Sequence, residues 1–267
     1  MTSIQNTTFF LRKMSAVHEE PVEYSLGDIK LNALLGKNLQ FKFTGLIECV
    51  YCSRAIKKTF GDGYCFPCSQ KLARCDLCIL KPELCHFRHG TCREPEWGRE
   101  NCLIKHAVYL SNTSGLKVGI TREHQKTQRW IDQGAREALV VAIVPERYIA
   151  GTFEVSLSGI VGDKTDWRSL IVGKNKEVDL FQEKERIVKV LKDEYKAYLV
   201  DAEEYGGKWS FKYPIIKYPE KAKTHNFDKE RVLKGALNGI RGQYIFIDEV
   251  AVNIRKFSGY QIEFSSF

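Results

Sequence analysis

Two pairs of closely spaced cysteines carry the clearest chemical signal in the sequence. Two residues separate Cys49 from Cys52 and Cys65 from Cys68, and twelve residues lie between the two pairs. Each pair can present two sulfur atoms to one ion from a tight turn, and together they complete a tetrahedral site of four thiolates. The spacing predicts a structural zinc site, because four protein ligands leave no coordination position for water.

A second group of cysteines and histidines follows and indicates another four-ligand site. We choose Cys78, Cys85, Cys92 and Cys102 as its ligands. Four further residues compete for the same places: Cys75, His86, His89 and His106. A four-cysteine set could instead hold an iron–sulfur cluster, although these spacings match no ferredoxin pattern. We therefore expect two structural Zn²⁺ ions.

The distribution of the cysteines also bears on cellular location and on charge. All nine lie between Cys49 and Cys102, and we find no secretory signal before them. Cytosolic thiols are kept reduced, so this distribution favours metal binding over a disulfide framework. Eight metal-bound thiolates and two Zn²⁺ would lower the formal net charge from +8 to about +4. This mild basic excess permits nucleic-acid binding without predicting it.

The apolar segments are short. The longest uninterrupted apolar run, Ala138 to Val144, falls far short of a membrane span. We therefore expect a cytoplasmic protein without a membrane partner.

A tyrosine, a lysine, an arginine and a glutamate follow the cysteines in a characteristic order. Tyr109 lies in the apolar stretch Ala107–Leu110 and Lys117 in the next one, Leu116–Ile120; Arg129 and Glu154 come later. This order resembles the core of the GIY-YIG nuclease superfamily over residues 105–161. Ala107-Val108-Tyr109 would stand for the first tripeptide, and Lys117-Val118-Gly119 for the second, with lysine at its tyrosine position.

The resemblance implies a metal-dependent nuclease. Arg129 would contact the phosphate through a bidentate fork, and Glu154 would hold one Mg²⁺ or Mn²⁺ ion. Tyr109 would orient or deprotonate a water molecule, and Lys117 would neutralise the scissile phosphate. The residues by themselves also fit ordinary roles: a half-buried core tyrosine, and lysine, arginine and glutamate side chains in solvent.

A second resemblance extends over nearly the whole chain. The stretch from Arg129 to Ala135, together with the cysteine-rich region before it, resembles an uncharacterised bacterial family known as domain of unknown function 2797. That resemblance implies no activity.

Basic residues are interleaved with aromatic ones around the second cysteine set. Such a surface suits phosphate contacts and base stacking, although a solvated loop has the same composition. The expected nucleic-acid contacts are Arg88, Arg93, Arg99, Lys105 and Arg122.

The elements that must hold the Tyr–Lys–Arg–Glu set can be predicted from periodicity. We expect strands over Ala107–Leu110 and Leu116–Ile120, a helix over His124–Gln133 closed by Gly134, and a buried strand over Ala138–Val144. A helix that opens at Pro145 completes the unit, with apolar residues at helical spacing: Ile149, Phe153, Leu157 and Ile160.

The remaining segments give weaker patterns. Asn38 to Phe43 alternates like a half-buried strand, and Val188, Leu191, Tyr195 and Tyr198 suggest one helix. A helix start is expected within Asp163–Arg168, capped by Thr165 or Asp166. Strands are expected over Trp209–Tyr213, Gln243–Asp248, Val250–Ile254 and Tyr260–Phe264, the last three as a β-meander.

These patterns predict an α+β fold with four parts. Residues 1–48 form an N-terminal β segment and 49–104 a zinc-ribbon-like module; 105–200 form a GIY-YIG-like ββαβα domain and 201–267 a β-rich region joined by strands from both termini. The expected function is a metal-dependent nuclease, or a protein derived from one, that acts on DNA or RNA. The alternatives are a non-catalytic zinc-ribbon protein that binds DNA or RNA and a zinc-stapled protein-interaction module.

Overall fold

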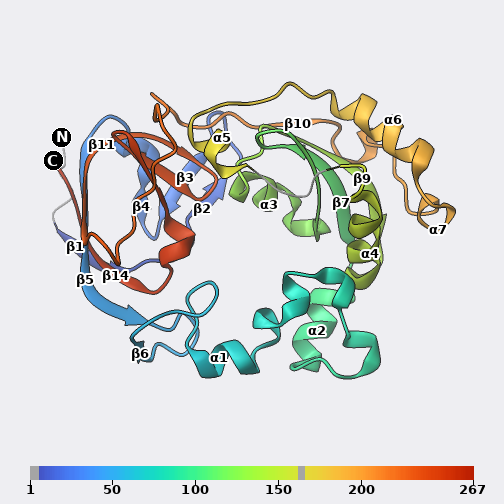
Figure 1. Cartoon of the computed structure of the whole chain (residues 1–267), viewed down its shortest axis with the longest axis horizontal. Helices are drawn as coiled ribbons and strands as arrows, with labels where there is room; N and C mark the ends of the chain where they lie inside the picture. Colours follow the sequence, from blue (N-terminus) through green and yellow to red (C-terminus); the bar gives the residue numbers. More distant parts are fainter. Residues whose placement is uncertain (1–5, 162–165) are drawn as a thin grey trace. The chain divides into compact units, whose positions relative to one another are not determined.

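The computed structural model describes residues 6–161 and 166–267. The chain forms two compact units, shown as ribbons in Figure 1. The first unit comprises residues 1–70, 171–173 and 212–267, and the second comprises 71–170 and 174–211. Helices and sheets are mixed, so the predicted α+β class is confirmed. The first predicted cysteine set lies in the first unit and the second set in the second unit.

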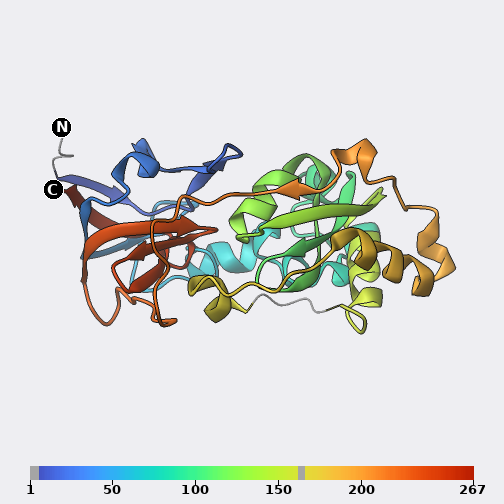
Figure 2. The ribbon, with the colours of Figure 1, turned by 90° about the horizontal axis from the view of Figure 1, so that it is seen from above.

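The first unit is built on an antiparallel sheet. Its strand order is β1-β14-β5-β11-β12-β13, and the two-residue strand β6 pairs with the end of β5. The strands are β1 (Thr7–Phe10), β5 (Asn38–Glu48), β6 (Ala55–Ile56), β11 (Val232–Arg241), β12 (Tyr244–Ile247), β13 (Val250–Asn253) and β14 (Tyr260–Ser266). The predicted alternation holds on β5, where Leu39, Phe41 and Phe43 are buried. Strands from both ends of the chain pair side by side, as predicted (Figure 2).

The predicted meander of three consecutive strands is wrong in its last member. β12 and β13 form a hairpin, but β14 pairs with β5 and β1. A 3₁₀ helix over Ile254–Phe257 and Gly259, with φ at +91°, turn the chain away from β13. The rings of Phe41 and Phe264 then meet edge to face, with their centroids 5.0 Å apart, and both side chains are buried in the new pairing.

A small second sheet completes the first unit. It contains β2 (Ser15–Val17), β3 (Glu23–Leu26) and β4 (Ile29–Lys30) in sequential antiparallel order. The Tyr24 hydroxyl of β3 accepts a hydrogen bond from the Gly242 N–H in the two-residue turn between β11 and β12. The small sheet is thus fastened to the hairpin of the main sheet.

The second unit has a four-stranded antiparallel sheet in the order β10-β9-β7-β8. Its strands are β7 (His106–Asn112), β8 (Leu116–Arg122), β9 (Glu137–Val144) and β10 (Trp209–Ser210). The first three confirm the predicted strands, each extended by one to three residues. The strand predicted over Trp209–Tyr213 is shorter, because its pairing with β9 ends at Ser210 and Pro214 follows soon after.

Helices cover both faces of this sheet (Figure 1). On one face, α3 (Lys126–Asp132) places Trp130 against Tyr109 of β7. On the other, α4 (Arg147–Leu157) packs Phe153 and Leu157 into a core with Val108, Leu110 and Val118. The order strand, strand, helix, strand, helix is the predicted one. Gly134 closes α3 with φ at +71°, as its sequence position suggests.

The single helix predicted through Val188 and Tyr198 is wrong. The chain forms α6 (Leu180–Val190) and α7 (Asp193–Lys196), with extended backbone at Leu191 and Lys192 between them. The break lets Leu191 and Tyr195 both reach the core, where the ring of Tyr195 lies 4.6 Å from that of Phe153.

Among the described residues, three short α-helices remain: α1 (Phe66–Lys71), α2 (Pro95–Cys102) and α5 (Trp167–Ile171). The Asp166 carboxylate accepts hydrogen bonds from the Arg168 N–H and the Ser169 hydroxyl at the start of α5, so Asp166 caps this helix. The other predicted cap, Thr165, lies outside the described residues. Within the described ranges, no helix has the length and apolar character needed to cross a membrane.

Candidate functional site

The first cysteine cluster comprises Cys49, Cys52, Cys65 and Cys68, whose sulfur atoms all lie within 4.8 Å of one another. The Cys52 and Cys65 sulfurs are 3.8 Å apart, the separation of about 3.8 Å that follows from tetrahedral geometry with Zn–S bonds of about 2.3 Å. Backbone N–H groups of Cys65 and Cys68 point at the sulfurs of Cys49 and Cys65, at 3.2 and 3.5 Å. The four residues therefore fit a metal ion such as zinc.

The electrostatics of the first cluster also suit a cation. Burial acts to raise the pKa of Cys49, but N–H groups of Cys52, Cys65 and Tyr51 outweigh it and lower the pKa to about 6. Burial and the neighbouring thiols raise the pKa of Cys68. One thiolate is therefore already favoured at neutral pH, and a bound cation would favour the rest.

A turn of the main sheet supports the first cluster. The Val50 N–H donates to the Gly63 carbonyl at 2.9 Å, and the Glu48 N–H to the Gly259 carbonyl at 2.8 Å. A Cβ on Gly63 would lie 2.7 Å from the Ser258 carbonyl oxygen, and Gly63 has φ at +100°. Only glycine allows this close approach, which brings the loop between the two cysteine pairs against the turn before β14.

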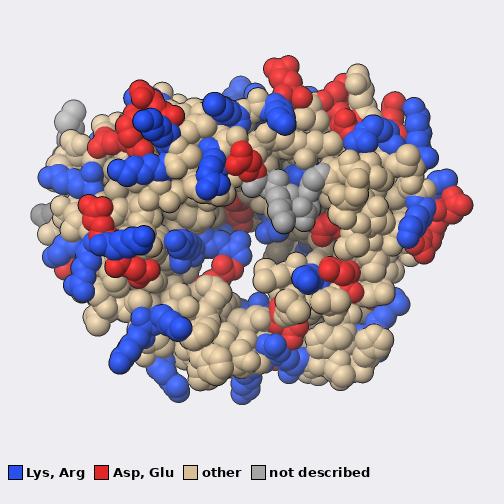
Figure 3. All heavy atoms as spheres, viewed as in Figure 1, with Lys and Arg blue, Asp and Glu red and all other residues tan. Residues whose placement is uncertain are grey.

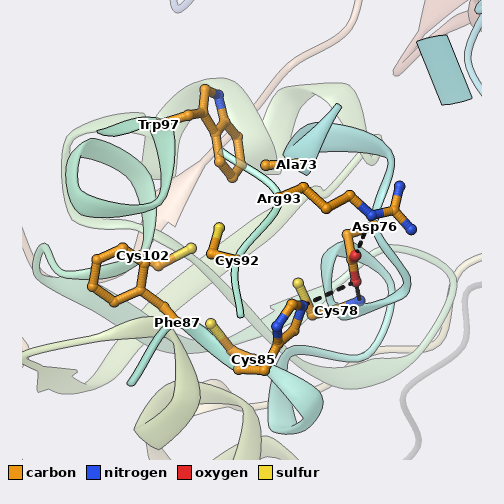
Figure 4. A pocket seen from close by; sticks show the side chains of 10 residues that line it. Ala73, Asp76, Cys78, Cys85, Phe87, Cys92, Arg93, Trp97 and Cys102 are labelled. Atoms are coloured by element: carbon orange, nitrogen blue, oxygen red, sulfur yellow. Dashed lines mark hydrogen bonds and ion pairs between the residues drawn. The ribbon is translucent and has the colours of Figure 1, made fainter. Parts of the chain in front are cut away.

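The second cysteine cluster comprises Cys78, Cys85, Cys92 and Cys102, which line one small pocket (Figure 4). Hydrogen bonds from Cys102 and Cys78 hold the pKa of Cys85 far below its usual range, and the same contacts raise the pKa of the two donors. Thiol sulfurs are ligands that a soft cation such as zinc takes, but among the described residues only Cys78 of these four belongs to a group, with Asp76 and His86, whose ligand atoms all lie within 4.8 Å of one another.

The other residues considered as ligands lie in different places. His86 lines the same pocket, and its ring forms a further group with Asp76 and Cys78 in which the ligand atoms lie within 4.8 Å. His89 is exposed. His106 is fully buried, and its Nδ1 donates to the Ile104 carbonyl at 2.7 Å. Neither His89 nor His106 lines the pocket.

Tyr109 lies on the face of the second sheet that α3 covers. Its partner across β8 is Gly119, and a Cβ on Gly119 would lie 2.7 Å from the Tyr109 hydroxyl oxygen. The missing side chain thus makes room for the phenol ring. Trp130 of α3 meets the ring edge-on at 5.7 Å, and Tyr109 has no exposed surface.

Gln133 links Tyr109 to Arg129. Arginine can only donate hydrogen bonds, so the Gln133 amide oxygen faces Arg129, at 3.1 Å from Nε and 3.2 Å from Nη2. The amide nitrogen then donates to the Tyr109 hydroxyl at 2.9 Å. Gln133 is not among the predicted site residues, although its position four residues after Arg129 on a predicted helix places both on one face.

The other two members of the predicted set, Glu154 and Lys117, come from α4 and β8. Burial raises the pKa of Tyr109, Glu154 adds to the increase, and Arg129 opposes it. Glu154 is half-buried on α4. Lys117 is 7% exposed, and the register of β7 and β8 places it on the same sheet face as Tyr109.

Four of the five basic residues expected to contact nucleic acid have partners within the protein. Arg88 pairs with Glu146 at 2.7 Å, Arg93 with Asp76 at 2.7 Å, and Arg99 with Glu96 at 2.8 Å. Arg122 lies over the Trp97 ring and donates to the Asn101 carbonyl at 3.4 Å. Lys105 is exposed. Figure 3 shows basic and acidic side chains interspersed on the visible face.

A family model for a protein of unknown function, DUF2797, matches residues 36–262. The chain belongs to the DUF2797 family. No curated protein and no solved structure matches it. The DUF2797 match contains both cysteine clusters and the whole Tyr109–Glu154 set, so these features lie within the part of the chain that defines the family.

Proposed function

We propose that this DUF2797 protein is a metal-dependent nuclease of the GIY-YIG type that cleaves phosphodiester bonds in DNA or RNA. The observation that carries the proposal is the linked Tyr109–Gln133–Arg129 group; the charge of Glu154 acts to raise the pKa of the phenol. The ββαβα order of β7, β8, α3, β9 and α4 supports it.

Each residue of the group has a role in this proposal. Arg129 is exposed at the end of the link and would bind a phosphate through two N–H groups. The Gln133 amide donates to the Tyr109 hydroxyl, which leaves the phenol proton to be donated onward. With its pKa raised, Tyr109 acts as a neutral donor that orients water or the scissile phosphate, not as the base. Lys117 supplies positive charge on the same face.

A single carboxylate is compatible with a hard cation that keeps most of its waters, so Glu154 would hold the Mg²⁺ or Mn²⁺ ion. When bound, such an ion lowers the pKa of coordinated water and stabilises negative charge on phosphate.

The test uses the metal-loaded protein with mixed DNA and RNA substrates, with and without Mn²⁺. We expect Glu154→Gln to abolish cleavage and to leave nucleic-acid binding nearly unchanged, because the variant removes one ligand charge and no basic group. Arg129→Ala should weaken both cleavage and binding. The matched control is Glu185→Gln, at an exposed position of α6. Undiminished cleavage by Glu154→Gln would contradict the assignment.

One observation favours a second candidate, a non-catalytic protein that binds DNA or RNA. Tyr109 is completely buried, and a buried neutral phenol is an ordinary core residue. This candidate predicts binding that weakens steeply with salt, because several phosphates are neutralised, without cleavage under any metal condition. Absence of any salt-dependent binding would instead favour a protein-interaction module.

A further inference from the structure

The loop that carries the second cysteine cluster is fastened to the first two turns of α4. The Arg147 guanidinium donates to the Ile79 carbonyl at 2.9 Å and to the Cys78 carbonyl at 3.3 Å. Just before the helix, the buried Glu146 accepts from Arg88 Nε at 2.8 Å. A cluster ligand and a residue near the cluster thus both hold the start of α4.

One turn further on, α4 meets the backbone of the same loop. A Cβ on Gly151 would lie 2.2 Å from the Glu83 backbone nitrogen and 2.4 Å from the Pro82 carbonyl carbon. Residues 147, 151 and 154 are spaced by four and three positions, so they lie along one face of the helix. The face of α4 that contacts the loop therefore also carries Glu154.

A metal ion bound in the cluster would change the charge beside Arg147, the residue that holds the loop against α4. A divalent ion with four thiolates leaves a net charge of about −2 in a buried place, which neighbouring cations must offset. The Arg147 guanidinium, which donates to the carbonyls of Cys78 and Ile79, is a cation beside the cluster. The loop has few apolar side chains of its own in this cluster, chiefly Phe87 and Trp97 around the sulfurs. A segment with so small an apolar core needs a further constraint to stay ordered, which a bound metal ion would supply.

We propose that the second cysteine cluster is a metal-dependent brace for α4, and that Arg147 is the positioning residue that couples metal occupancy to the placement of Glu154. The part of this proposal that concerns cleavage rests on the proposed function. The brace itself does not.

The first experiment measures hydrogen exchange and zinc content in Cys85→Ser. We expect zinc to fall from about two ions to about one, and exchange at the α4 amides to become about tenfold faster, while α6 keeps its protection. The matched control is Cys75→Ser, in the same segment but outside the cluster, which should keep both zinc ions and the wild-type exchange of α4. Loss of zinc with unchanged exchange in α4 would overturn the proposal.

A second pair of variants keeps the proposal testable if Cys85→Ser unfolds the whole unit. Arg147→Gln removes the positive charge and the hydrogen bonds of the guanidinium to the carbonyls of Cys78 and Ile79. Arg147→Lys keeps the positive charge and one donor group. We expect Arg147→Gln to speed both α4 exchange and the extraction of zinc from the second cluster by a chelator by about tenfold, with partial rescue in Arg147→Lys. Arg186→Gln on α6 serves as the control. Wild-type behaviour of Arg147→Gln would refute its role.

Cleavage assays separate this proposal from the proposed function. In an active preparation, Arg147→Gln should raise the Mn²⁺ concentration for half-maximal cleavage about tenfold, with little change in rate at saturating Mn²⁺. If no preparation cleaves nucleic acid but α4 responds to zinc loss, the brace stands and the nuclease assignment fails. If wild type cleaves but α4 ignores zinc loss, the brace fails and the nuclease stands.

Discussion

At the scale of single residues, the position of Tyr109 depends on Gly119 and Gln133. Gly119 leaves space on β8 for the phenol ring, and Gln133 fixes the hydroxyl from α3. Sequence order identified Tyr109 and Arg129 as a pair, but it could not show that a third side chain joins them. That link depends on where α3 lies on the sheet, which periodicity does not determine.

The first prediction concerns this link. Gln133→Met removes the amide that serves both Tyr109 and Arg129, and it leaves a buried hydroxyl without that donor. We expect the free energy of unfolding to fall by about 1–2 kcal/mol, as for other buried polar groups that lose a partner, with a clear loss of any cleavage activity. Urea denaturation measures the stability.

The control for that change is Gln128→Met. Its amide donates to Asp132 within α3, so stability should change by no more than about 0.5 kcal/mol. Equal losses in the two variants would show that the link to Tyr109 adds nothing to stability.

The second prediction concerns pH. Burial lowers the pKa of His106 to about 4, while an unfolded histidine titrates near 6.5. As pH falls below about 6.5, the unfolded chain takes up a proton that the folded protein rejects, so stability declines until about pH 4. The loss from this group should be about 1 kcal/mol at pH 5.5.

Denaturation of wild type and His106→Asn at pH 7.5 and 5.5 tests this. The asparagine amide can keep the hydrogen bond to Ile104 and does not titrate, so the variant should lose less stability than wild type on acidification. His89→Asn, at an exposed position, should lose as much stability as the wild type when the pH is lowered. Identical pH dependence in His106→Asn and wild type would exclude the assignment.

At the scale of elements, close contact between α4 and the cysteine-rich loop gives a third prediction. In Gly151→Ala, the gain in helix propensity is about 1 kcal/mol, but the added Cβ would meet backbone atoms at 2.2 and 2.4 Å. Backbone cannot yield cheaply, so we expect a net destabilisation of about 2 kcal/mol. Thermal or urea unfolding measures it.

Gly159→Ala is the comparison, because nothing lies within 4 Å of its added Cβ. It should be neutral or slightly stabilising. A stabilised Gly151→Ala protein would mean that helix propensity outweighs the contact with the loop.

The elements also show which parts of the fold the sequence can reveal. Alternation and capping residues predict β5, β7, β8, α3 and β9, because each depends on local periodicity or on a nearby glycine such as Gly134. The pairing of β14 with β5 joins Phe264 to Phe41, far apart in the chain, and no local pattern distinguishes it from a meander. The break at Leu191 likewise serves packing against Phe153, which only the folded core specifies.

The candidate site likewise has features that the sequence predicts and features that it does not. The spacing of Cys49, Cys52, Cys65 and Cys68 fixes a cluster because each pair forms within one turn. The contacts of Arg147 could not be predicted from the sequence, because its partners, the carbonyls of Cys78 and Ile79, are backbone groups from a loop that is distant in the chain. Backbone acceptors leave no signature in a sequence.

At the scale of the whole molecule, the two clusters belong to different units, which gives the fourth prediction. Cys49→Ser should remove one of about two zinc ions and destabilise the first unit severely, because metal-binding energy is folding energy in small metal modules. The region from Lys105 to Phe211 has its own apolar core and should stay folded. Elemental analysis and limited proteolysis with mass spectrometry measure both effects.

Cys75→Ser provides the control and should retain both ions and the wild-type digestion pattern. Equal degradation of both units in Cys49→Ser would contradict their independence. Iron with a visible absorbance band in the wild type would assign an iron–sulfur cluster to one of the sites.

The pairing of β5 has a consequence for the order in which the protein folds during synthesis. Strand β5 ends at Glu48, yet both of its long neighbours, β11 and β14, lie beyond residue 231. The second unit is built entirely from residues made in between. On the ribosome it can acquire its core while β5 still exposes two unpaired edges, so the nascent first unit stays open to wrong strand partners until translation nears its end.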